Sequence, residues 1–157
     1  MYNFSCLTEG QNKASELDFL IDRYTKYMRP YAKIKRLLYK GESITRPKEK
    51  EALLKKEEER IIRLLPNNHS LIVLSEHGTN YTSQEFASLI DKLAAGGAQS
   101  LAFVIGSPLG ISESLQKQAQ AVLSLSPLTF PHDIAEVLLY EQLYRAMTIL
   151  NSKTYHY

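Results

Sequence analysis

The stretch Ser100-Leu-Ala-Phe-Val-Ile-Gly-Ser-Pro-Leu-Gly110 decides the fold class of this chain. Its first six residues form an apolar run that ends in a glycine- and proline-rich turn, which is typical of a strand buried on both faces. A second run of this kind, Ser70-Leu-Ile-Val-Leu74, precedes it. Strands buried on both faces belong to mostly parallel sheets covered by helices, so the two runs predict an α/β domain.

Further elements follow on both sides of these strands. Period-2 and period-3.6 patterns predict additional strands at 2–7, 34–39 and 121–124, and helices at about 15–27, 48–65, 83–95, 112–118 and 131–150. We expect Ser83 to cap one helix, Gly96-Gly97 to end it, and Pro131 to be the first residue of the last helix. The order predicts a single domain over residues 1–157, with a mostly parallel sheet and helices on both faces.

Composition narrows the class of protein. With 44% apolar and 23% charged residues, the chain has the balance of a soluble globular domain. No apolar run approaches the roughly 20 residues that span a bilayer, and residues 1–10 lack the basic start and long apolar stretch of a secretory signal. Cys6 is the only cysteine, which excludes an internal disulfide and predicts a small core residue in a cytoplasmic protein.

Positive charge is concentrated in the first half of the chain. Although the net charge is only +2, residues 23–63 hold 14 of the 19 Lys and Arg residues against 6 acids, a local net charge of +8. From residue 64 onward the net charge is −3. This asymmetry is typical of proteins that bind polyanions, but it is equally compatible with solvated helix faces.

Three loops leave the predicted strands at their carboxyl ends: 75–78, 106–110 and 125–130. Ligands of open α/β sheets bind at this edge, so we expect the loops to form one pocket with Leu74, Leu109 and Leu128 as apolar walls. The loops match neither the GxGxxG turn nor the P-loop, and the alternative interpretation is that their glycines only make tight turns.

Other chemistry has little support in the sequence. His69, His77, His132 and His156 lack the spacing of metal ligands, and no Ser-His-Asp signature is present, so no metal site is expected. The last predicted helix is apolar around almost its whole circumference. Such a helix is buried on all sides, which predicts a second subunit related by two-fold symmetry against the side that does not face the sheet.

The C-terminal half resembles the ribosomal RNA large-subunit methyltransferase H family, a minimal type of SPOUT methyltransferase. Order, spacing and total length agree, and the resemblance covers 64–157 well and 11–63 loosely. It is carried by the segments Leu74-Ser-Glu-His-Gly78, Thr82-Ser-Gln-Glu-Phe-Ala87, Phe103-Val-Ile-Gly106 through Gly110, Leu123-Ser-Leu-Ser126 with Thr129, Pro131-His132, Glu141-Gln-Leu-Tyr-Arg-Ala146 and Tyr155-His156.

The resemblance implies a C-terminal trefoil knot, an obligate homodimer and S-adenosylmethionine as cofactor. It implies methyl transfer to N3 of a pseudouridine in large-subunit (23S) ribosomal RNA, within the assembled ribosome, with no role for DNA or a membrane. As candidate catalytic residues near the substrate it implies His156, Tyr155 and His132. The residues that it implies for cofactor binding are Leu74, Gly106, Leu125, Ser126, Pro127, Leu128, Thr129 and Phe130.

Several positions depart from the family pattern. Ser75 replaces an Asp, Ser107 interrupts a glycine pair, Glu136 replaces a basic residue, and Tyr157 stands where a basic residue commonly follows the terminal Tyr-His. The usual Gly-Lys pair after the first strand is replaced within 9–13. These departures leave open a catalytically impaired dimer that binds S-adenosylmethionine or ribosomes. If the resemblance were accidental, the remaining interpretation would be a generic nucleotide-binding α/β domain.

Overall fold

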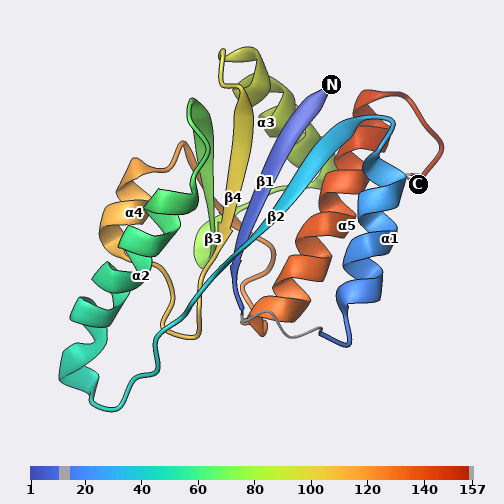
Figure 1. Ribbon diagram of the computed structural model, residues 1–157. Coiled ribbons are helices and arrows are strands. Elements are labelled where there is room, and N and C mark those ends of the chain that lie inside the picture. Colours follow the sequence, from blue (N-terminus) through green and yellow to red (C-terminus); the bar gives the residue numbers. More distant parts are fainter. Residues whose placement is uncertain (11–14, 156–157) are drawn as a thin grey trace.

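The computed structural model describes residues 1–10 and 15–155 (Figure 1). Five strands form one sheet in the order β2-β1-β4-β3-β5, and every pair of neighbours is parallel. The predicted α/β fold with a parallel sheet is therefore confirmed. The strands are β1 (Tyr2–Glu9), β2 (Ala32–Tyr39), β3 (His69–Asn80), β4 (Ser100–Ile105) and β5 (Ala121–Ser124).

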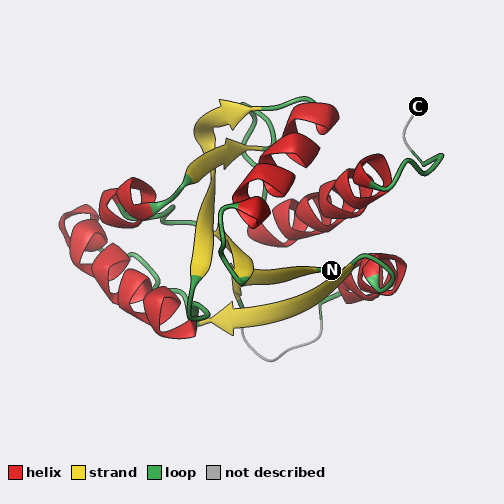
Figure 2. Ribbon diagram, turned by 90° about the horizontal axis from the view of Figure 1, so that it is seen from above, coloured by secondary structure: helices red, strands yellow, loops and turns green. Residues whose placement is uncertain are grey.

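Helices cover both faces of the sheet, as Figure 2 shows from above. One face carries α1, α3 and α5, with α5 packed against both α1 and α3, and the other face carries α2 and α4. The prediction of helices on both faces is confirmed. The helices are α1 (Asp18–Met28), the short 3-10 helix η1 (Pro47–Glu49), α2 (Lys50–Leu64), α3 (Ser83–Ala95), α4 (Glu113–Gln118) and α5 (His132–Leu150).

Alternation along the strands builds a separate apolar core on each face. On β1, Phe4 and Cys6 belong to the cluster under α1, α3 and α5, whereas Leu7 belongs to the cluster under α2 and α4. Cys6 is fully buried, as expected of a core residue, and burial raises the pKa of its thiol. The smaller cluster also contains Tyr39 and Ile61 and lies next to the loop that follows β4.

The structure corrects three predicted boundaries. Thr82, not Ser83, caps α3, because its hydroxyl accepts the Glu85 amide while the Glu85 carboxylate accepts the Thr82 amide. Pro131 is the extended N-cap of α5 rather than its first helical residue. Strand β3 continues beyond Leu74 to Asn80 after a bulge. Gly96 does cap the C-terminus of α3, as predicted.

The apolar circumference of α5 is covered largely within the chain. This helix packs against α1, α3, β1 and β4 and buries eight of its residues. What remains outward includes Ile134, which is 38% exposed, and the half-buried Leu138 one turn later. The apolar pattern of α5 is therefore weaker evidence for a second subunit than the sequence suggested. None of the helices within residues 1–10 and 15–155 has the length and apolar character needed to cross a membrane.

Candidate functional site

The carboxyl ends of β3, β4 and β5 and the start of α5 enclose one cavity of about 630 Å³, here called the three-loop pocket. Small-molecule sites typically measure about 300–1,000 Å³, so the cavity is large enough for a nucleoside-sized ligand. Its position is the edge at which parallel α/β sheets bind ligands. The lining residues are Lys50, Leu74, Ser75, Glu76, Ile105–Ile111, Leu125, Ser126, Leu128–His132 and Ala135.

The structure brings together most of the residues expected to hold a cofactor. All of them line the pocket except Pro127, which lies in the same loop but is not a lining residue. Leu128 is 72% exposed and therefore forms part of the rim rather than a buried wall. The predicted loop 75–78 is the bulge of β3, since Leu74 and Thr79 both pair with Leu123 of β5.

The Gly106–Gly110 loop is closed on itself. The Gly110 amide donates to the Ser107 carbonyl at 2.8 Å, and the Leu109 amide donates to the Ser107 hydroxyl at 3.1 Å. A Cβ on Gly106 would lie 2.8 Å from the Gly110 carbonyl oxygen and 2.7 Å from the Ile111 side chain. Gly110 itself has a φ of +89°, a conformation that favours glycine. Both glycines are therefore required by the shape of this pocket wall.

Tyr39 of β2 supports the same loop from below. Its hydroxyl donates to the carbonyl of Ile105, the last residue of β4, at 2.9 Å. Burial raises the pKa of Tyr39, and the nearby carboxylates of Glu57 and Glu9 raise it further. The phenol therefore stays protonated at neutral pH and remains a donor.

Tyr39→Phe is expected to destabilise the fold by about 1 kcal/mol, because it removes one buried hydrogen bond and leaves the Ile105 carbonyl without this donor. Urea unfolding of the variant and the wild type measures the difference. An unchanged unfolding midpoint would show that the bond contributes nothing to stability.

Of the three candidate catalytic residues, the structure places only His132 in the pocket. His132 is half-buried at the N-terminus of α5, and its Nδ1 lies 3.5 Å from Oε2 of Glu9, at the end of β1. Tyr155 folds back along the C-terminal half of α5: its ring packs edge-on against Tyr144 and under the Arg145 guanidinium, and its hydroxyl lies 3.3 Å from Oε1 of Glu141. Glu141 lies nine residues, about 13 Å, along α5 from His132, and Tyr155 is not among the residues that line the pocket. His156 lies outside the described residues.

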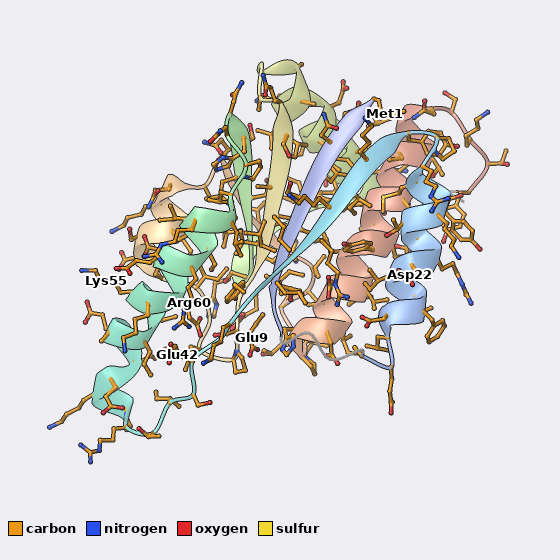
Figure 3. The ribbon with its side chains drawn as sticks, viewed as in Figure 1. Met1, Glu9, Asp22, Glu42, Lys55 and Arg60 are labelled. Carbon is orange, nitrogen blue, oxygen red and sulfur yellow. The ribbon has the colours of Figure 1, made fainter. Side chains whose placement is uncertain are left out.

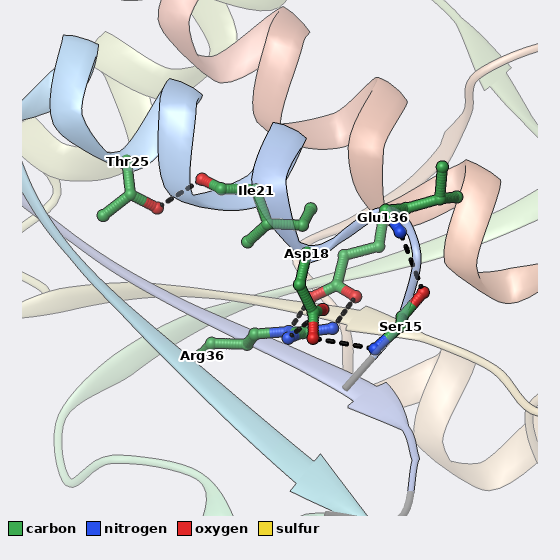
Figure 4. A network of polar contacts seen from close by, with 7 residues as sticks. Ser15, Asp18, Ile21, Thr25, Arg36 and Glu136 are labelled. Carbon is green, nitrogen blue, oxygen red and sulfur yellow. Dashed lines mark hydrogen bonds and ion pairs between the residues drawn. The ribbon is translucent and has the colours of Figure 1, made fainter. Parts of the chain in front are cut away.

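Glu136 is a buried carboxylate that forms an ion pair with the half-buried Arg36 (Figure 4). It is 2% exposed and accepts two hydrogen bonds from the Arg36 guanidinium, Nε to Oε1 at 2.7 Å and Nη2 to Oε2 at 2.8 Å. Asp18 accepts a third bond from the same guanidinium at 2.8 Å. Glu136 therefore presents no negative charge to a ligand, and its departure from the family pattern is balanced by Arg36.

Sequence reasoning missed Glu57, Glu9 and Lys50. Glu57 falls within a run of charged residues, yet it lies four residues before Ile61 on the apolar side of α2, and this spacing was the signal that it is buried. Glu9 and Lys50 carry no comparable signal, because the fold alone brings Lys50 to the pocket and Glu9 to His132. Among residues 1–10 and 15–155, no group of three or more His, Cys, Asp or Glu side chains is arranged to hold a metal ion.

Comparison with known proteins agrees with this architecture over nearly the whole chain. A family model described as "Predicted SPOUT methyltransferase" matches residues 2–156. The chain is 41% identical to the ribosomal RNA large subunit methyltransferase H of Kosmotoga olearia, with 87% of this chain and 88% of that protein covered. It is 38% identical to the protein of the same name from Syntrophobacter fumaroxidans, over 94% of each chain. It is 39% identical to that from an Exiguobacterium species, over 98% and 99%.

Both measures point the same way, since the family model spans almost all of the sequence and the relatives align over nearly their full lengths. A generic nucleotide-binding domain with an accidental resemblance is thereby excluded. The chain belongs to the SPOUT methyltransferase family, in the group whose members are named ribosomal RNA large subunit methyltransferase H.

Proposed function

We propose that this protein transfers a methyl group from S-adenosylmethionine to N3 of a pseudouridine in large-subunit ribosomal RNA. The observation that carries the proposal is the three-loop pocket, closed by the Gly106–Gly110 loop, at the carboxyl edge of the sheet. The names of the relatives supply the class of substrate. Family membership also implies the C-terminal trefoil knot, a feature very rare outside such folds.

The residues of the pocket fit S-adenosylmethionine. Leu74, Leu125 and Phe130 offer apolar surface to an adenine ring, and the exposed backbone of the tight loops offers hydrogen bonds to its edge. Lys50 reaches the pocket from the start of α2 and can neutralise the carboxylate of the methionine end. When bound, S-adenosylmethionine supplies a methyl group that is already activated by the sulfonium, so no nucleophilic side chain is needed.

The task left to the protein is to align the target nitrogen with the methyl group and to accept its proton. His132 is the candidate acceptor among the described residues that line the pocket, because it is the only imidazole there. Glu9 faces its Nδ1, which favours the tautomer that carries hydrogen on Nδ1 and leaves Nε2 free to accept.

The outward face of the edge strand β2 supports RNA as the partner. Lys33 and Lys35 are two residues apart, so both side chains leave the same face of the strand, and Lys40 follows just beyond its end. All three are exposed. Phosphate contacts position a protein on RNA without reading its sequence, and such a row of lysines is suited to them.

Reversing two of these charges, Lys33→Glu with Lys35→Glu, is expected to weaken RNA binding and to lower the slope of log affinity against log salt by about 1.5, as loss of two phosphate contacts predicts. Binding of S-adenosylhomocysteine should not change, since neither residue lines the pocket. Filter binding across a salt series measures the slope.

The matched control is Lys92→Glu with Lys153→Glu, two exposed lysines on other elements. An equal loss of affinity in both pairs would mean that net charge alone, rather than β2, attracts the RNA.

A homodimer is part of the proposal. Within one chain the pocket lies at the N-terminal end of α5, whereas Tyr155 packs on the C-terminal half of the helix and does not line the pocket, so a site that uses both would take Tyr155 from a second copy. The exposed apolar side chains of Leu128 and Ile134, beside the pocket, offer a contact surface for that copy. A protein that modifies ribosomal RNA in this way would work in the cytoplasm, on the assembled ribosome.

Mass spectrometry of large-subunit RNA from a strain that lacks this chain tests the proposal. We expect one methylated pseudouridine to lose its methyl group and to regain it when the gene is restored. RNA that keeps all its marks would contradict the proposed activity. If the protein binds S-adenosylhomocysteine in calorimetry but no mark depends on it, the catalytically impaired dimer becomes the better interpretation.

A further inference from the structure

Glu57 is a buried carboxylate that the proposed reaction does not use. It is 1% exposed, and it is one of only two fully buried side chains of α2, the other being Ile61. Burying a carboxylate is costly unless hydrogen bonds satisfy both of its oxygens. Burial accordingly raises the pKa of Glu57, while its hydrogen bonds from the Glu42 amide and the Ser107 hydroxyl act to lower it. Because burying this carboxylate costs free energy, we expect its role to lie in what its hydrogen bonds hold in place.

The two oxygens of Glu57 accept bonds from two different segments. Oε1 accepts the backbone amide of Glu42 at 2.6 Å, in the segment that follows β2, and Oε2 accepts the Ser107 hydroxyl at 2.8 Å. The Glu42 side is held a second time, because Arg60 of α2 binds both the Glu42 carboxylate and the Lys40 carbonyl. Figure 3 shows Arg60 and Glu42 turned toward each other, with Glu9 nearby.

Ser107 connects the Glu57 carboxylate to the loop that lines the pocket. Its hydroxyl donates to Glu57 and at the same time accepts the Leu109 amide, so one oxygen atom ties the carboxylate to the inside of the Gly106–Gly110 loop. Ser107 is 7% exposed and Leu109 is 8% exposed, so water does not readily replace these bonds. The position of the loop therefore depends on the position of α2.

We propose that Glu57 is a positioning residue for the methyl-donor pocket, acting through the Ser107 hydroxyl on the Gly106–Gly110 loop. The proposal rests on the proposed function for the identity of the ligand, but not for the link itself. It also gives Ser107 a role: a glycine at this position has no hydroxyl to offer Glu57, so the serine marks a restraint that depends on its own side chain.

The test compares Ser107→Ala, Glu57→Gln and the double variant with Glu59→Gln, an exposed carboxylate on the same helix. Loss of a bond to a charged acceptor is worth a factor of about ten or more, so we expect Ser107→Ala to weaken S-adenosylhomocysteine binding about tenfold. Glu57→Gln should weaken it less, because the amide oxygen still accepts one donor. The KM for S-adenosylmethionine should rise while kcat changes little.

Non-additivity identifies the link. Because both substitutions act on the same Ser107–Glu57 bond, the double variant should bind no more weakly than Ser107→Ala alone. Amide hydrogen exchange gives a readout that needs no ligand. The amides of Leu109 and Gly110 should exchange faster than in the wild type in Ser107→Ala and Glu57→Gln, and at the wild-type rate in Glu59→Gln.

Additive losses of affinity, or exchange at Leu109 and Gly110 equal to that of Glu59→Gln, would overturn the proposal. If the wild type binds no S-adenosylhomocysteine, the proposed function fails, and the exchange comparison still decides whether Glu57 positions the loop.

Discussion

Gly106→Ala is expected to lower the affinity for S-adenosylhomocysteine by about a hundredfold, or about 2.7 kcal/mol. The added methyl group would lie 2.8 Å from the Gly110 carbonyl oxygen, which is backbone and cannot rotate away. The Ile111 side chain at 2.7 Å can adjust, but the Gly106–Gly110 loop must open to separate the new Cβ from the Gly110 carbonyl oxygen. Opening the loop displaces one wall of the three-loop pocket.

The control is Gly96→Ala, which makes the same chemical change at the C-cap of α3, outside the pocket. There the new Cβ would meet nothing nearer than the Leu93 carbonyl oxygen at 3.3 Å. Calorimetric titration of both variants, after circular dichroism has shown that both are folded, measures the difference. Equal affinities in the two variants would show that the tight loop is not part of the ligand site.

Arg36→Leu is expected to destabilise the fold by about 3 kcal/mol, because it leaves the buried Glu136 carboxylate without its cationic partner. The double variant Arg36→Leu with Glu136→Leu should recover most of this loss, to within about 1 kcal/mol of the wild type, since it removes the buried carboxylate together with its half-buried partner. Urea unfolding of the three proteins measures the free energies.

Lys35→Leu serves as the control, because Lys35 is exposed and adjacent in the same strand. A loss in Arg36→Leu no larger than in the control would contradict the assigned ion pair. The same geometry predicts that Glu136→Arg would not repair a defect, since it would place two guanidinium groups in one buried site.

The strands and helices followed from the sequence because their signals are local. The runs 70–74 and 100–105 are apolar enough to be buried on both faces, and the glycines after 105 and after 95 mark the end of a strand and of a helix. One error is equally local, whereas another depends on a distant strand. Thr82 and Ser83 are both good caps, and only the reciprocal bonds with Glu85 distinguish them. The bulge in β3 depends on β5, which lies more than 40 residues later.

The pocket could be predicted as a place but not as a set of contacts. Carboxyl ends of parallel strands meet at one edge, so the loops after 74, 105 and 124 had to converge. The charges around them could not be foreseen, because their partners are distant in sequence: Glu9 meets His132, Arg36 meets Glu136, and Glu57 meets Ser107. The sequence flagged Ser107 and Glu136 as departures, and the structure pairs each of them.

Methyl transfer to ribosomes tests the central claim most directly. Ribosomes from a strain that lacks this chain are incubated with the purified protein and S-adenosylmethionine labelled in its methyl group. Gly106→Ala serves as the matched variant and a related active enzyme as the positive control. We predict label at N3 of a single pseudouridine of the large-subunit RNA, strongly reduced in the variant. Unlabelled RNA, in an assay in which the positive control labels its own target, would contradict the claim.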